Sequence, residues 1–187
     1  MPEFTNPPLR EVVFNVTSRP LDDFLVPHVG LLWQEFRCEF PKCQEQPALA
    51  RIVEAMPGSD LQITADARAL PRSWFLTEDG RKLLQVQRDR FIFNWKKVED
   101  DDPYCRFPSL FIDFERHFMT FREFLANNKI GQPDPIQYEL TYLNHMPIDH
   151  EWKDLGDIGN VLANVSWSND VDTFLPASEN FAVKMVF

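Results

Sequence analysis

The residues that could do chemistry gather around two histidines near the end of the chain. His145 and His150 flank a Met-Pro-Ile-Asp stretch, and Asp149 and Glu151 lie beside His150. Imidazole and carboxylate groups together can ligate a metal or act as acid and base. The stretch contains a proline and lacks helical metal-site spacing, so nothing local holds these groups on one side. Loop polarity explains them as well. An enzyme using His145, Asp149 and His150 is therefore the least favoured hypothesis.

The three cysteines form no recognisable metal or redox motif. Cys38 and Cys43 are five residues apart and Cys105 is distant, whereas zinc sites pair two closely spaced ligand sets. An odd count without an apolar leader argues against a disulfide framework. Phosphate loops and nucleophile elbows are absent from the sequence. We expect no catalytic residue, no metal and no cofactor.

The charge distribution limits the possible partners. The formal net charge is −10, which argues against extended nucleic-acid binding because phosphates need clustered Lys and Arg. Six basic residues and one acid lie between positions 81 and 97, followed by the acidic run 99–102. This basic hairpin is either a solvated surface or a docking site for an acidic partner or a second copy. No apolar run approaches the roughly 18 residues of a membrane span. We expect a cytoplasmic protein.

Hydrophobic periodicity predicts the elements that must position these side chains. Alternating residues predict strands over 11–17 and 137–144. Segment 72–95 is typical of a three-stranded antiparallel meander with turns at Glu78-Asp79-Gly80 and Arg88-Asp89-Arg90. Apolar stripes predict helices over about 24–40 and 108–127. The pattern indicates an α+β fold, in which an antiparallel sheet of about five to seven strands carries two amphipathic helices on one face.

Other segments are less regular. Asp22 or Asp23 is the expected N-cap of the first helix. Arg51–Met56 fits a short helix or a strand, and Leu61–Ala65 fits an extended piece. We expect a core domain over residues 1–150. Residues 151–187 are a polar loop followed by a strand at Asn180–Phe187, which either closes the sheet or begins a truncated C-terminal half.

The meander carries unusually polar side chains on one side. If Leu84, Val86 and the aromatic residues of 91–95 face the helices, Gln85, Gln87 and Asn94 share the opposite face. Glu139, Thr141 and Gln137 would lie near them, flanked by arginines. One face of an antiparallel sheet normally meets water, so a solvated surface is the alternative. The candidate binding residues are Gln85, Gln87, Arg88, Arg90, Asn94, Glu139 and Thr141.

Several runs resemble a family of uncharacterised bacterial proteins of sporadic distribution. They are Asn6–Phe14 (NPPLREVVF), Trp33–Phe36 (WQEF), Trp74–Gly80 (WFLTEDG), Leu84–Phe91 (LQVQRDRF) with Phe93–Trp95 (FNW), and Tyr138–Pro147 (YELTYLNHMP). Members of that family look longer, with more strands and a final helix near a Trp-Gly-Arg triplet, which implies that this chain is truncated. The patchy distribution implies carriage on mobile or defence-associated DNA, as for accessory or antitoxin-like proteins.

Two non-catalytic hypotheses remain. The favoured one is a protein-interaction module that binds a partner or a second copy through the polar face, the basic hairpin or an unpaired edge near 180–187. The alternative is a small-ligand-binding domain with a pocket between the Phe-rich helices and the sheet.

Overall fold

The computed structural model describes residues 7–53, 62–64, 70–145, 153 and 157–161. The chain divides into two units, residues 1–144 and residues 145–187. The described part of the second unit includes the short helix α3 (Ile158–Val161). The predicted residues Asp149 and His150 and the predicted strand Asn180–Phe187 lie outside the described residues.

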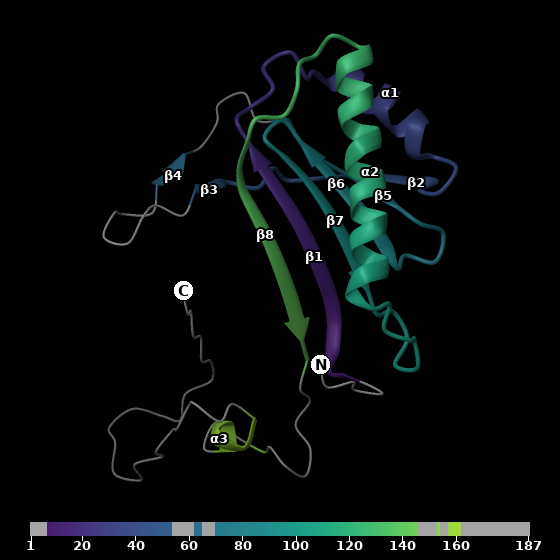
Figure 1. Ribbon diagram of the computed structural model, residues 1–187, viewed down its shortest axis with the longest axis vertical. Helices are drawn as coiled ribbons and strands as arrows, with labels where there is room; N and C mark the ends of the chain where they lie inside the picture. Colours follow the sequence, from purple (N-terminus) through teal and green to yellow (C-terminus); the bar gives the residue numbers. More distant parts are fainter. Residues whose placement is uncertain (1–6, 54–61, 65–69, 146–152, 154–156, 162–187) are drawn as a thin grey trace. The chain divides into compact units, whose positions relative to one another are not determined.

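A six-stranded antiparallel sheet forms the first unit, in the order β2-β5-β6-β7-β1-β8 (Figure 1). The prediction of an α+β fold with five to seven strands is confirmed. The strands are β1 (Leu9–Ser18), β2 (Lys42–Gln46), β5 (Arg72–Leu76), β6 (Lys82–Gln87), β7 (Arg90–Lys96) and β8 (Pro135–Asn144). β3 (Arg51–Val53) and β4 (Gln62–Thr64) form a separate two-stranded sheet.

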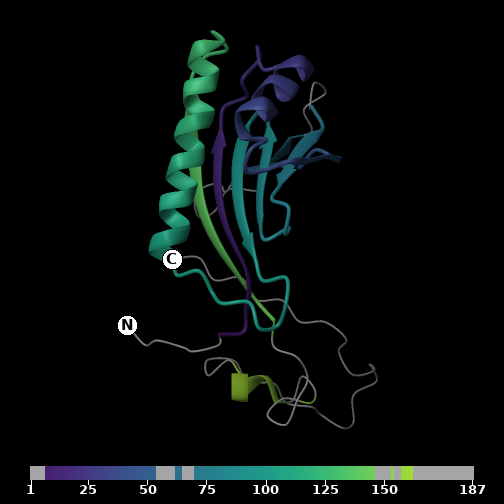
Figure 2. The ribbon, with the colours of Figure 1, turned by 90° about the vertical axis from the view of Figure 1, so that its right-hand side faces the viewer.

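Two helices pack on one face of the six-stranded sheet. They are α1 (Val26–Phe36) and α2 (Phe107–Asn127), and Figure 2 shows α2 running along the sheet. Phe114 of α2 stacks on Phe14 of β1, with ring centroids 5.2 Å apart, and Phe121 stacks on Phe91 at 5.1 Å. The rings bury a large apolar area, so this contact supplies much of the hydrophobic stabilisation.

The first helix is shorter than its apolar stripe predicts, and the predicted N-cap at Asp22 or Asp23 is wrong. Its N-cap is Leu25, whose backbone N–H donates to His28 Nδ1 at 3.0 Å. Pro27 explains the late start, because it has no N–H to donate to the carbonyl of an N-cap at Asp23 and is tolerated only in the first turn. Arg88 Nε donates to the carbonyl oxygen of Phe24, just before the helix, at 3.0 Å. After α1 the chain forms β2, an edge strand of exposed polar residues without the apolar alternation that predicts strands.

The meander at 72–95 forms as predicted, as β5, β6 and β7. Gly80 in its first turn has φ +71°, a left-handed conformation that favours glycine. Among the described helices, none is both long and apolar enough to cross a bilayer.

Candidate binding site on the polar face of the sheet

Strand register places most predicted binding residues on the face away from the helices. Gln87 of β6 lies opposite Arg90 of β7, which lies opposite Thr17 of β1, which lies opposite Gln137 of β8. Side chains two residues along a strand share its face. Gln85, Asn94, Glu139 and Thr141 therefore lie on this same side, which we call the polar face.

Arg88 does not join them. It lies in the turn between β6 and β7, and its guanidinium donates to the Phe24 carbonyl in front of α1. The backbone carbonyl of Arg88 also accepts a hydrogen bond from the Leu21 N–H at 3.0 Å. These contacts give Arg88 a role in attaching α1 to the sheet.

The meander residues of the polar face are buried, whereas the sequence predicts that they point outward. Gln85 is 6% exposed, Gln87 5% and Asn94 3%. They lie on the predicted side, but neighbouring polar side chains and the chain near Leu49 cover them. Thr141 and Glu139 on β8 are exposed, so the open part of the face lies towards that strand.

A chain of hydrogen bonds explains how the buried amides are tolerated. Gln85 Oε1 accepts from Arg72 Nη1 at 2.9 Å and from Trp74 Nε1 at 3.0 Å. Gln85 Nε2 donates to Asn94 Oδ1 at 2.7 Å, and Asn94 Nδ2 donates to Glu11 Oε1 at 2.6 Å. The chain crosses β5, β6, β7 and β1. It fixes the orientation of both amides, since each oxygen faces only donors.

Gln87 and Arg90 bind main chain. The N–H of Leu49 donates to Gln87 Oε1 at 2.9 Å, and Gln87 Nε2 donates back to the Leu49 carbonyl at 3.1 Å. Arg90 Nη2 donates to the Ala50 carbonyl at 3.3 Å, while its charge is balanced by Asp89 at 3.1 Å. The polar face therefore already holds one stretch of backbone from outside the six-stranded sheet.

Beside that stretch the polar face is hollowed. The hollow has a volume of about 580 Å³, within the range of ligand sites. Its polar lining comes from β1, β5, β6, β7 and β8 and includes Asn15, Arg72, Arg90, Gln137, Glu139 and Thr141.

Two groups in the hollow keep unused hydrogen-bonding capacity. Arg72 Nε and Asn15 Oδ1 are buried and have no partner in the structure. Burial lowers the pKa of Arg72, and the nearby positive charge of Arg90 lowers it further. A bound anion would raise the pKa of Arg72 again, because an opposite charge favours the guanidinium cation. The hollow is therefore suited to a ligand that presents an acceptor near Arg72.

Sequence reasoning missed Asn15, Thr17 and Arg72. The signal for the first two was present, because Asn15 and Thr17 alternate with the apolar residues of β1. Arg72 carries no such signal, since its role depends on the pairing of β5 with its neighbours.

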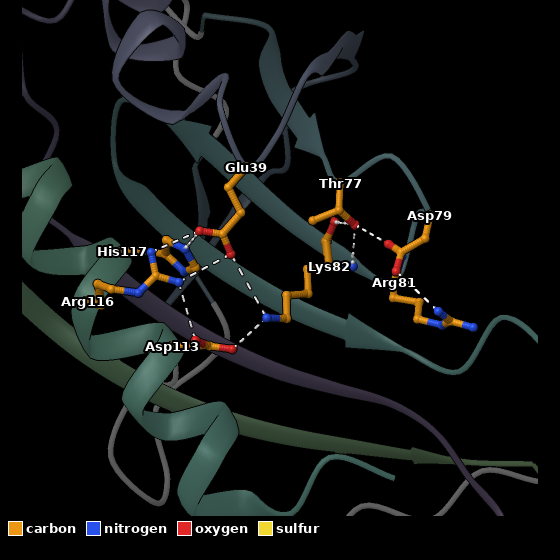
Figure 3. Close-up of polar contacts among 8 residues, drawn as sticks. All are labelled: Glu39, Thr77, Asp79, Arg81, Lys82, Asp113, Arg116 and His117. Carbon is orange, nitrogen blue, oxygen red and sulfur yellow. Dashed lines mark hydrogen bonds and ion pairs between the residues drawn. The ribbon is translucent and has the colours of Figure 1, made fainter. Parts of the chain in front are cut away.

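The predicted basic hairpin is largely occupied by internal partners. Arg81 pairs with Asp102 and, at 3.3 Å, with Asp79. Lys82 Nζ lies 2.7 Å from Asp113 Oδ2 (Figure 3). The hydrogen bond from Arg81 leads the causes that hold the pKa of Asp102 far below its usual range. The acidic run after β7 thus supplies an internal partner for the basic hairpin.

A second polar cluster lies between the end of α1, α2 and β6 (Figure 3). His117 is 1% exposed, and its Nε2 lies 3.1 Å from Glu39 Oε2, which Arg116 also contacts at 2.9 Å. Burial lowers the pKa of His117 despite the carboxylate. Burial opposes the ionisation of Glu39, but hydrogen bonds from Arg116 and His117 outweigh it and lower its pKa.

Aromatic rings enclose the imidazole of this cluster. The ring centroid of His117 lies 5.1 Å from that of Phe40, 5.5 Å from Phe93 and 6.0 Å from Phe36. A neutral imidazole so enclosed is suited to packing and to donating one hydrogen bond to Glu39. The cluster therefore connects the segment after α1 to α2.

The remaining candidate residues for chemistry are scattered. His145 is exposed just after β8. Cys38 and Cys43 are exposed free thiols and Cys105 is half-buried. Within the described ranges no three His, Cys, Asp or Glu side chains are grouped to hold a metal ion.

Comparison with protein-family models, curated proteins and solved structures finds no match to this chain. The function must therefore be argued from the polar face itself.

Proposed function

We propose that this chain is a non-enzymatic interaction module whose polar face holds a main-chain segment of a protein partner. The observation that carries the proposal is the double hydrogen bond between the Gln87 amide and the backbone of Leu49. A side-chain amide that pairs with both backbone groups recognises main chain irrespective of side chains. The hollow beside it leaves room for a second segment.

The charges of the hollow indicate the kind of segment. Arg72 of β5 has a buried N–H without a partner, and Asn15 of β1 has a buried acceptor without one. A carboxylate side chain near Arg72 and a backbone N–H near Asn15 would satisfy both. We therefore propose a partner segment that carries an acidic residue. Such a partner, together with the resemblance to a bacterial family of sporadic distribution, favours an accessory or antitoxin-like role in the cytoplasm.

A small carboxylate ligand is the second candidate. The volume of the hollow, about 580 Å³, favours it. Its place differs from the expected pocket between the helices and the sheet, where the groove beside Phe14 and Phe114 is smaller, about 210 Å³.

Affinity capture from the source cells tests the proposal. We expect the native chain to recover one protein in stoichiometric amount and Arg72→Gln to lose it. Arg122→Gln is the matched control, because it removes one positive charge from the exposed surface of α2. Recovery of no stoichiometric protein, or equal recovery by both variants, would contradict the proposal. Recovery of a small carboxylate instead would favour the second candidate.

A further inference from the structure

In the part of the chain that the structure describes, strand β8 is an edge of the six-stranded sheet with no strand beyond it. It is last in the strand order and is ten residues long (Figure 1). Tyr138 is 71% exposed, Leu143 53%, Leu140 45% and Tyr142 43%. Exposed apolar side chains on a long edge strand are a template for pairing with another strand.

Of the devices that block edge pairing, the middle of β8 has only the charged side chain of Glu139. Seven consecutive residue pairs with β1 run without a bulge, and register shifts occur only at the two ends. Between Ile136 and Leu143 the strand has no lysine, arginine or proline. The opposite edge differs, because β2 has five residues, begins with Lys42 and is almost entirely exposed and polar. The β8 edge is therefore less protected than the β2 edge.

Apolar surface continues from β8 onto the start of α2. A groove of about 210 Å³ lies there, lined by Phe14, Phe107, Phe111, Phe114, Tyr138 and Leu140. Phe107 is 39% exposed and Phe111 37%. A strand added beside β8 would bring its own side chains next to this groove and extend the core outward.

We propose that β8 of a second copy of this chain pairs antiparallel with β8 across a twofold axis at Leu140. In this register Leu140 meets its counterpart, and Tyr138 lies opposite Tyr142 of the other copy. Glu139 lies opposite Thr141 of the other copy, whose hydroxyl donates to Glu139 of its own chain at 3.2 Å and can turn to the carboxylate across the interface. Each of these pairs brings together complementary groups, and aromatic cross-strand pairs are favourable.

Charge and length select this register over its neighbours. A twofold axis perpendicular to the sheet places side chains of the same face opposite each other only when it passes through a residue. The neighbouring registers therefore have the axis at Glu139 or at Thr141. An axis at Glu139 would place two carboxylates opposite each other, which is unfavourable. An axis at Thr141 would place Glu139 opposite Leu143 and shorten the overlap. The self-complementarity about Leu140 is what makes a second copy the occupant.

Sedimentation of the intact chain tests the proposal. We expect a dimer that Leu140→Lys weakens by a factor on the order of 100, because two leucines leave apolar contact and two cations face each other. Thr141→Lys should keep the dimer, since it sets an ammonium opposite Glu139 of the other copy. Leu31→Lys is the control, because Leu31 is 50% exposed on α1 and folding should tolerate the lysine equally. A native chain that stays monomeric at all concentrations, or a dimer that Leu140→Lys leaves intact, would overturn the proposal.

Cysteine cross-linking tests the register in a chain whose three native cysteines are serine. Opposite residues of an antiparallel pair lie close enough for a disulfide. Leu140→Cys should therefore give a disulfide-linked dimer under mild oxidation. Tyr138→Cys alone should not, because two copies of residue 138 lie four positions apart in this register. Linkage through residue 138 but not 140 would overturn the proposed axis.

Discussion

Removal of the Gln87 side chain should release the main chain that the polar face holds. In Gln87→Ala the Leu49 N–H loses its 2.9 Å acceptor and the Leu49 carbonyl its 3.1 Å donor. Each hydrogen bond contributes about 0.5–1.5 kcal/mol net, so the two together stabilise the attachment by about 1–3 kcal/mol. The loss of Gln87 Nε2 from Asp89 matters less, because Arg90 still contacts that carboxylate.

Hydrogen exchange at the Leu49 amide measures this energy directly. Since about 1.4 kcal/mol is a factor of ten, its protection should fall by about 5-fold to about 150-fold in Gln87→Ala. Gln44→Ala is the matched control, because it removes the same side chain from an exposed position in β2. Unchanged protection at Leu49 in Gln87→Ala would refute the inference that this amide holds main chain, and with it the main support for the proposed function.

Three further predictions follow from the buried groups and the first turn of the meander. Because burial lowers the pKa of His117, the unfolded chain takes up a proton first as pH falls, so stability drops below about pH 6.5. Denaturant unfolding between pH 7 and pH 5 should show a smaller loss of stability in His117→Phe than in the native chain. His145→Gln is the control, because it removes an exposed histidine. Gln85→Leu leaves the buried Asn94 oxygen unpaired and should cost about 2 kcal/mol, seen as a lower urea midpoint; an unchanged midpoint would contradict the hydrogen-bond chain. Gly80→Ala should cost about 1 kcal/mol from backbone strain alone, since an added Cβ there meets nothing within 4 Å, and Gly80→Asn should cost less.

Local periodicity was sufficient to predict the two long helices, the meander and the strands at both ends of the first unit. These elements have a clear apolar face, which one-dimensional patterns record. The short strand β2 has no such face, because its residues are polar and exposed and it is placed by pairing with β5. The start of α1 was missed although its signal is local, because Pro27 must lie in the first turn of the helix.

The sequence was sufficient to predict which face of the sheet the candidate site residues occupy, but not their burial. Alternation placed Gln85, Gln87 and Asn94 on the face away from the helices, because side-chain direction in a strand is a local property. Their burial was not predictable, since it depends on Arg72, Trp74 and the main chain near Leu49. Arg88 lies off the polar face for a related reason, because a turn breaks the alternation that the flanking strands obey.

Photo-cross-linking in the source cells tests the central claim most directly. A photoreactive residue at Thr141, exposed on the rim of the hollow, should capture one protein other than a second copy of this chain, through a short acidic segment identified by mass spectrometry. The same residue at Glu115, exposed on α2, should not capture it. Capture of no protein at Thr141, or of the same proteins at both positions, would contradict the claim that the polar face is a partner-binding surface.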